Sequence, residues 1–141
     1  MKKILIVNSN YYEKISDNLI DNAKKKLSSS KFKVSKIDVP GIFEISIAIR
    51  KNIKKFDAFI ALGCVIKGQT PHFDLLCSSL FDSILNLSIK FNKPIGNGII
   101  TALNLSQAVE RSKNTKSKKT DKGSDAANAV ISILQNGPKK I

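Results

Sequence analysis

Short apolar runs that alternate with helical periods constrain the fold of this chain more than any other feature. Residues 4–7 and 58–65 are apolar runs of the kind found in strands that are buried on both faces. Residues 33–39 and 95–103 are weaker candidates for strands. Between these runs, apolar residues recur at steps of three and four, as along one face of a helix. The alternation predicts an α/β fold in three layers, in which helices cover both faces of a central four-stranded parallel sheet.

Five segments carry the helical period. The longest runs over residues 73–91, where steps of four and three keep one face apolar. A shorter helix is expected over residues 42–53. Asn104 precedes Gln107 by three residues, a capping-box spacing that predicts a helix start there and a helix through Arg111. The two remaining segments are residues 15–27 and 126–134.

The length of 141 residues predicts one domain, residues 1–141. A composition of 42% hydrophobic and 25% charged residues is that of a soluble globular protein, and no apolar run is long enough to cross a membrane. The chain starts like a signal peptide, but the apolar stretch ends after residue 7, so it is interpreted as a strand. Cys64 and Cys77 lack the spacing of a disulfide framework or a zinc site, which favours a reducing, cytoplasmic compartment.

The formal net charge of +13 raises the hypothesis of nucleic-acid binding. Of the 24 basic residues, 22 are lysines scattered along the whole chain. A surface that reads bases is expected to interleave arginine and aromatic residues, and this sequence does not. We therefore expect neither a specific nucleic-acid partner nor a membrane partner.

Three segments are expected at the carboxyl edge of the sheet, where ligands bind in parallel α/β folds. They are residues 8–12, 40–44 and 66–72. In the third, Gly68, Gln69 and Thr70 lead into a helix with Pro71 expected at its first position. The free N–H groups and dipole of such a helix start suit a phosphate, although an ordinary helix cap has the same sequence.

His72 is the only histidine and follows this helix start directly. It is either a proton-transferring group or a surface histidine. Arg111 and Lys122 are either phosphate ligands or solvated charges. Glu44 either orients a polar ligand or complements the dipole of the helix that it precedes. One histidine and two unpaired cysteines predict no metal site.

Two motifs together resemble the lumazine synthase family: Gly-x-Thr-Pro-His at residues 68–72 and Gln-Ala-x-Glu-Arg at residues 107–111. The resemblance extends over nearly the whole chain and implies a flavodoxin-like fold. It also implies condensation of 5-amino-6-(D-ribitylamino)uracil with 3,4-dihydroxy-2-butanone 4-phosphate, without a cofactor, to give 6,7-dimethyl-8-ribityllumazine and phosphate. The further matching stretches are residues 40–45, 57–67, 73–74, 98–101 and 122–123.

The resemblance also implies a role for each site residue. His72 would move protons during the condensation. The substrate-binding residues would be, for the phosphate, Gly68, Gln69, Thr70, Arg111 and Lys122, and for the pyrimidine and its ribityl chain, Tyr11, Ile42, Phe43, Glu44, Cys64, Val65, Ile66 and Asn97.

Several positions depart from the family pattern. Tyr11 stands where the family usually has Phe or Trp, and Asn97 stands where a neighbouring subunit often contributes Phe. Lys67 replaces a common Arg, and Ile42 replaces a small residue. Two other hypotheses therefore stay open: a diverged activity on the same fold, and a flavin-binding protein without catalysis.

The resemblance implies a homo-oligomer whose sites lie between subunits. Relatives form pentamers, and some build shells from pentamers. Here the connection over residues 112–122 is about three residues longer than in compact relatives, as judged from motif spacing. That connection, together with the lack of a segment before the first strand, favours an isolated pentamer over a larger shell.

Overall fold

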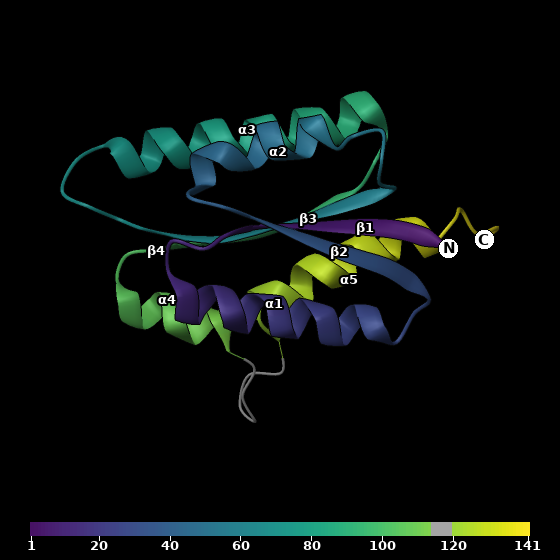
Figure 1. Cartoon of the computed structure of the whole chain (residues 1–141), viewed down its shortest axis with the longest axis horizontal. Helices are drawn as coiled ribbons and strands as arrows, with labels where there is room; N and C mark the ends of the chain where they lie inside the picture. The colour runs from purple at the N-terminus through teal and green to yellow at the C-terminus, as the bar shows by residue number, and fades with distance from the viewer. Residues whose placement is uncertain (114–119) are drawn as a thin grey trace.

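The computed structural model describes residues 1–113 and 120–141, arranged in three layers (Figure 1). Helices α2 and α3 cover one face of the sheet, and α1, α4 and α5 cover the other. The elements are β1 (Lys2–Ser9), α1 (Glu13–Ser28), β2 (Phe32–Val39), a 3-10 turn η1 (Ile42–Glu44), α2 (Ile45–Lys51), β3 (Ala58–Ile66), α3 (His72–Phe91), β4 (Ile95–Ala102), α4 (Leu105–Ser112) and α5 (Lys122–Gln135).

The sheet has the order β2-β1-β3-β4, and every pair of neighbouring strands is parallel. Ile4 of β1 pairs with Val34 of β2 on one side and with Ala58 of β3 on the other. The predicted four-stranded parallel sheet is thus confirmed. The two strongest apolar runs of the sequence form the central strands, and the two weaker runs form the edges.

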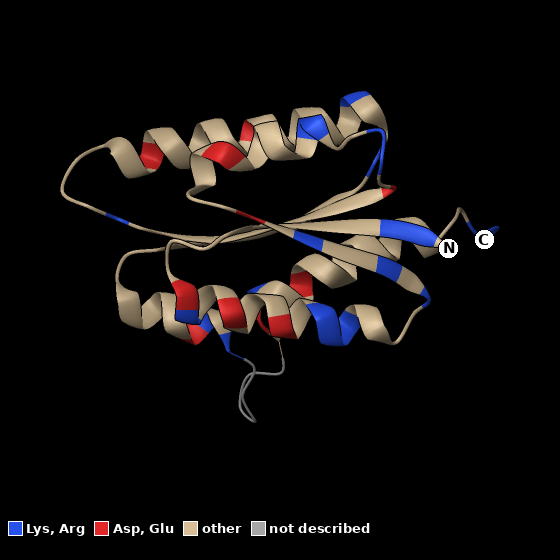
Figure 2. Ribbon diagram, viewed as in Figure 1, with Lys and Arg blue, Asp and Glu red and all other residues tan. Residues whose placement is uncertain are grey.

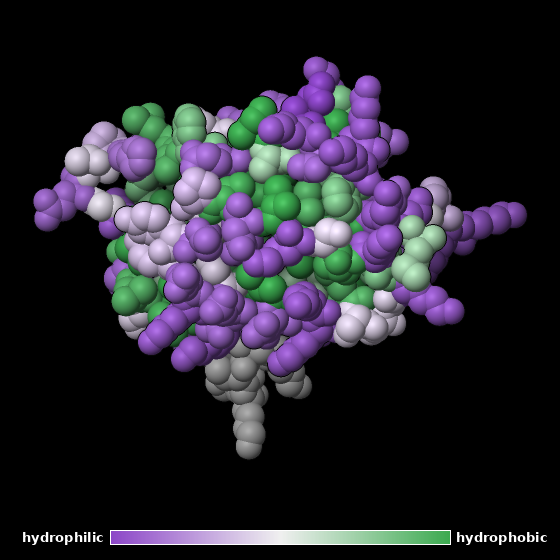
Figure 3. Space-filling model, in the orientation of Figure 1, coloured by the Kyte–Doolittle hydropathy of each residue, from purple (hydrophilic) through white to green (hydrophobic). Residues whose placement is uncertain are grey.

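Burial on both faces explains why β1 and β3 read as continuous apolar runs. Ile4 and Ile6 pack against α1 and α5, whereas Leu5 and Val7 pack against α2 and α3. Strand β3 alternates in the same way. In the space-filling view, apolar side chains run along the middle of the molecule between two polar helical layers (Figure 3).

The predicted helix over residues 42–53 is shorter than expected at both ends. Ile42 to Glu44 form a 3-10 turn, in which the Glu44 N–H donates to the Gly41 carbonyl at 3.3 Å. Helix α2 then ends at Lys51, although Ile53 is still buried. The Lys93 ammonium donates to the carbonyls of Ile53 and Phe56, so tertiary hydrogen bonds satisfy this backbone where the helix has ended.

The starts of α3 and α4 follow local chemistry. Pro71 was predicted at the first helical position but is the N-cap of α3, so the helix begins one residue later, at His72; the Pro71 carbonyl accepts the Leu75 N–H at 3.1 Å. The capping box of α4 is confirmed, because Asn104 Oδ1 accepts the Gln107 N–H at 2.9 Å. Gln107 Oε1 in turn accepts the Leu103 N–H at 2.9 Å. The predicted connection over residues 112–122 lies largely outside the described residues.

Charges are distributed over the whole surface. Lys and Arg occur on both helical layers and at the strand ends, and along α1 the acidic residues lie mainly in the first turns while lysines gather near the end (Figure 2). Every helix in residues 1–113 and 120–141 is too short or too polar to cross a bilayer.

Gly123 permits a close approach between α5 and α1. A Cβ atom at this position would lie 2.4 Å from the Leu19 carbonyl oxygen, which belongs to the backbone and cannot swing aside. Two residues earlier, Asp121 is a buried cap whose carboxylate accepts the Ser124 N–H at 2.8 Å. The start of α5 is therefore fixed by the Asp121 cap and by the contact at Gly123. Lys122 lies between these two residues.

We predict that Gly123→Ala destabilises the protein by about 1–3 kcal/mol. Helix propensity alone would predict the opposite sign, since alanine favours helices by about 1 kcal/mol over glycine. The measurement is chemical unfolding at a fixed protein concentration. Gly137→Ala, at a position with open space, is the matched control and should change stability by less than about 0.5 kcal/mol. If Gly123→Ala were as stable as Gly137→Ala, the claim that α5 packs tightly against α1 at Gly123 would be refuted.

Candidate active site

A cavity of about 300 Å³ opens at the carboxyl edge of the sheet, where the segments after β1, β2 and β3 come together. This is the edge at which parallel α/β folds bind ligands. The cavity is lined by Ser9, Tyr11 and Tyr12 from the first segment, Gly41, Ile42 and Phe43 from the second, Cys64, Val65 and Ile66 from β3, and His72 and Leu76 from α3.

Aromatic rings stand beside this cavity. The Tyr11 and Phe43 side chains are 73% and 78% exposed, which leaves their rings open to a ligand. Tyr12 packs edge-on against Tyr11 with ring centroids 5.0 Å apart, and burial raises the pKa of its hydroxyl. Exposed aromatic faces of this kind are suited to stacking on a flat heterocycle.

Cys64 provides an uncharged wall. It is buried at the end of β3, and desolvation raises the pKa of its thiol to about 11. The thiol therefore stays protonated at physiological pH. Because the thiolate is the reactive form of cysteine, this residue shapes the cavity and does not act as a nucleophile.

His72 begins α3 and is exposed on the cavity wall. Its backbone N–H points to Thr70 Oγ1 at 3.4 Å, the upper limit for a hydrogen bond. The preceding residues Gly68, Gln69 and Thr70 are exposed, and a Cβ at Gly68 would meet nothing within 4 Å. The His72 imidazole thus adjoins an accessible helix N-terminus. The helix N-terminus can bind an anion, and the imidazole can transfer protons beside it.

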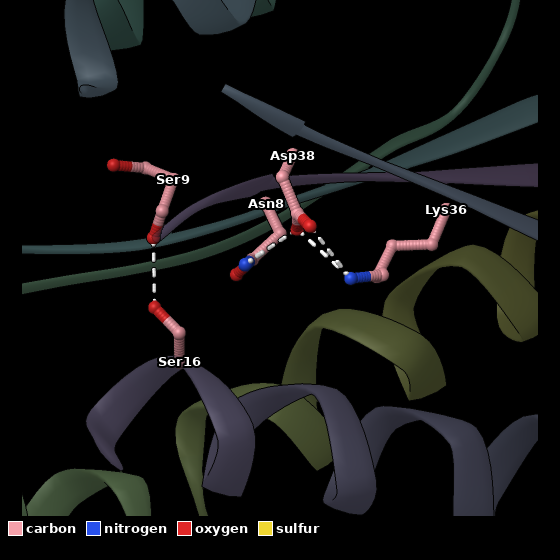
Figure 4. Close-up of polar contacts among 5 residues, drawn as sticks. All are labelled: Asn8, Ser9, Ser16, Lys36 and Asp38. Atoms are coloured by element: carbon pink, nitrogen blue, oxygen red, sulfur yellow. Dashed lines mark hydrogen bonds and ion pairs between the residues drawn. The ribbon is translucent and has the colours of Figure 1, made fainter. Parts of the chain in front are cut away.

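Hydrogen bonds fix the end of β1 at the cavity floor (Figure 4). Ser16 Oγ of α1 donates to the Ser9 carbonyl at 2.7 Å. Asn8 Nδ2 donates to Asp38 at 3.1 Å, and the Lys36 ammonium donates to both Asp38 carboxylate oxygens at 2.9 Å. The bond from Lys36, followed by that from Asn8, lowers the pKa of the Asp38 carboxyl, which therefore remains ionised.

Seven of the predicted site residues line this one cavity. Glu44 lies just beyond it, as the cap of α2, and its Oε1 approaches Gly41, where a Cβ would lie 3.3 Å away. The seven residues are Tyr11, Ile42, Phe43, Cys64, Val65, Ile66 and His72.

Arg111 lies at the same edge but outside the cavity. Its Nη1 donates to the Thr101 carbonyl at 2.6 Å, and Thr101 pairs with Val65, a residue of the cavity wall. Lys122 begins α5 and lies beneath the sheet, next to the Gly123–Leu19 contact. Within one chain, these two cations and the cavity are not brought together.

Asn97 lies in a separate groove between β4 and α3. It is exposed, and its neighbours there include Phe81 and Leu85. It precedes Ala102, the last residue of β4, by five positions, or roughly 16 Å of strand. A single chain therefore does not bring Asn97 to the cavity.

The cavity also contains four residues that the sequence had not singled out: Ser9, Tyr12, Gly41 and Leu76. Three of them lie in the strand-end segments 8–12 and 40–44, so the predicted topology already indicated their neighbourhood. Leu76 could have been found from its spacing, four residues after His72 on the same helix face. Among the described residues, no three His, Cys, Asp or Glu side chains form a potential metal site.

Comparison with known proteins matches this chain to one family. The sequence model described as 6,7-dimethyl-8-ribityllumazine synthase matches residues 1–136. A protein of that name from Campylobacter curvus is 36% identical over 94% of this chain and 86% of its own length. Proteins of that name from Bartonella tribocorum and Campylobacter jejuni are 37% and 38% identical, over 92% and 94% of this chain and 88% and 87% of their own lengths.

Proposed function

The chain belongs to the 6,7-dimethyl-8-ribityllumazine synthase family, and from this premise we propose how its cavity carries out the reaction. It is an enzyme of riboflavin biosynthesis that forms 6,7-dimethyl-8-ribityllumazine. The proposed substrates are 5-amino-6-(D-ribitylamino)uracil and 3,4-dihydroxy-2-butanone 4-phosphate. One observation carries the proposal: a single cavity combines an aromatic ring, an uncharged wall and the only histidine of the chain.

The pyrimidine half of the site is the cavity itself. The exposed ring of Tyr11 stacks on the uracil, and Cys64 and Val65 form the wall along its edge. The backbone of Ile42 and Phe43 offers polar groups beside the ring, as does the backbone of Ile66. The Glu44 carboxylate accepts hydrogen bonds from the ribityl hydroxyls, a role supported by its approach to Gly41 at the cavity rim.

The phosphate half is the start of α3. The amides of Gly68, Gln69 and Thr70 and the positive end of the helix dipole attract the phosphate of the butanone. Arg111 and Lys122 add charge-assisted hydrogen bonds, and they stabilise the negative charge on the departing phosphate.

His72 moves protons between these two halves. The pyrimidine amine attacks the butanone carbonyl, and the resulting carbinolamine loses water to give an imine. Elimination then breaks the C–O bond to phosphate, which leaves with the electron pair, and the second amine closes the ring with loss of another water. An imidazole on the cavity wall can accept and return the protons of these steps. Holding both reactants together supplies much of the acceleration.

We predict that the purified protein forms lumazine from the two substrates and that His72→Asn lowers kcat by about 100-fold. The variant should remain faster than the uncatalysed reaction, because the two substrates are still held together. Lumazine fluorescence and phosphate release measure both rates. Wild-type protein that gives no product above the uncatalysed rate would refute the synthase function, and ligand binding without turnover would favour the flavin-binding alternative.

Replacing Arg111 should weaken binding of the phosphate substrate without affecting binding of the pyrimidine. We predict that Arg111→Ala raises KM for the butanone phosphate by about 10- to 100-fold, since hydrogen bonds to charged groups are lost. KM for the pyrimidine should change little. The other arginine offers a matched control: Arg50 lies over the Phe91 ring, 4.8 Å from its centroid, and Arg50→Ala should leave both constants unchanged. Equal increases in both constants for Arg111→Ala would contradict phosphate binding.

The proposal includes a cytoplasmic homopentamer with sites shared between subunits. The outer edges of the sheet, on β2 and β4, pair with no further strand within the described residues. On α3 beside β4, Leu85 and Ile89 are 58% and 70% exposed, an apolar surface next to Asn97. Asn97, Arg111 and Lys122 lie outside the cavity of their own chain, so a neighbouring subunit is the natural recipient of these side chains.

We predict a solution mass of about 78 kDa, five chains of 15.5 kDa, by light scattering. Leu85→Asp should lower both the mass and the specific activity, because it places a charge in the apolar contact. Ile141→Asp makes the same kind of change at the exposed end of the chain and should alter neither. A monomeric wild type would contradict shared sites, and a particle near one megadalton would contradict an isolated pentamer.

A further inference from the structure

The cavity floor contains a polar group without a hydrogen-bond partner. Ser9 is 1% exposed, and its Oγ forms no hydrogen bond within the described structure. Ser9 also lines the cavity. We propose that the Ser9 hydroxyl is a specificity-determining contact that hydrogen-bonds the ribitylaminopyrimidine and fixes its orientation.

The direction of the side chain follows from strand geometry. Leu5, Val7 and Ser9 occupy alternate positions of β1, and the first two pack toward α2 and α3. The Ser9 carbonyl accepts its bond from Ser16 on the α1 side, and the hydroxyl points the other way, toward the layer of α2 (Figure 4). The hydroxyl thus faces the side of the cavity that Ile42 and Leu76 line.

Gly63 of β3 lies directly beside this hydroxyl. A Cβ on Gly63 would lie 3.1 Å from Ser9 Cβ and 3.7 Å from Ser9 Oγ. The same Cβ would lie 3.2 Å from the Ile42 side chain, which also lines the cavity. Glycine at position 63 therefore keeps a side chain out of the narrow space between Ser9 and Ile42.

A buried hydroxyl without a partner costs free energy in the empty protein, and a ligand that supplies the partner removes this cost. Asn8 Oδ1 and Ser46 Oγ are also buried without partners in the described structure. Neither residue lines the cavity, and Asn8 Nδ2 already bonds to Asp38. Of these three residues, Ser9 is the one that lines the cavity.

The chemistry of the surroundings selects the pyrimidine over the phosphate. None of the residues that line the cavity is Asp, Glu, Lys or Arg. The proposed phosphate position lies outside, at the exposed residues 68–70. A hydroxyl both donates and accepts, so it matches a ring carbonyl, a ring N–H or a ribityl hydroxyl. This inference rests on the proposed function, since it assumes that the cavity takes the pyrimidine.

Ser9→Ala tests the contact with the full-length enzyme. We expect KM for the pyrimidine to rise about 3- to 10-fold, the effect of one lost hydrogen bond, with kcat and KM for the butanone phosphate nearly unchanged. Calorimetric titration with the pyrimidine alone should show the same loss of affinity. Ser9→Cys, which keeps the side-chain shape but bonds weakly, should behave like Ser9→Ala and guards against an effect of altered packing.

Ser46→Ala is the matched control, because it removes another buried hydroxyl without a partner, outside the cavity. It should leave both Michaelis constants at the wild-type values. The role of Ser9 would be refuted if Ser9→Ala and Ser9→Cys bound the pyrimidine as tightly as the wild type, or if both Michaelis constants rose equally. The synthase function would still stand in that case, provided that the wild type is active. An inactive wild type would instead refute the function, whatever the titrations show.

Discussion

The burial of β1 and β3 on both faces is the constraint on which the rest of the structure depends. Their side chains fill two separate cores, one against α1 and α5 and one against α2 and α3. Because the strands are parallel, their carboxyl ends meet at one edge, where the chain must leave the core. The cavity forms at this edge, and its shape is held by packing that extends through the whole molecule.

The site joins a rigid floor to an accessible rim. Ser9 and Cys64 are buried on strands, where the sheet fixes them, whereas Tyr11, Phe43 and the loop before His72 are exposed. This division suits a reaction with two substrates. A deep, uncharged pocket can fix a flat heterocycle by shape and single hydrogen bonds, while the outer helix N-terminus attracts a mobile anion by charge.

The proposed site residues are not all close together within one chain. Asn97 is roughly 16 Å of strand from the carboxyl edge, and Lys122 is held beneath the sheet by the contact of Gly123 with Leu19. Neither residue can reach the cavity of its own chain without disrupting the packing around it. In the proposed oligomer, the outer edge of β4, which pairs with no strand in the described structure, is available to a neighbouring subunit.

The sequence by itself determined the order of the elements, the parallel sheet and the loops that surround the cavity, because apolar periodicity and capping residues such as Asn104 act locally along the chain. Only the tertiary structure decided which site residues meet. Contacts across layers ended α2 before Ile53, buried the Asp121 cap and left Ser9 Oγ without a partner on the cavity floor. These outcomes depend on how helices and strands that are far apart in the sequence pack against one another. Such packing cannot be predicted from the residues next to a given position in the chain.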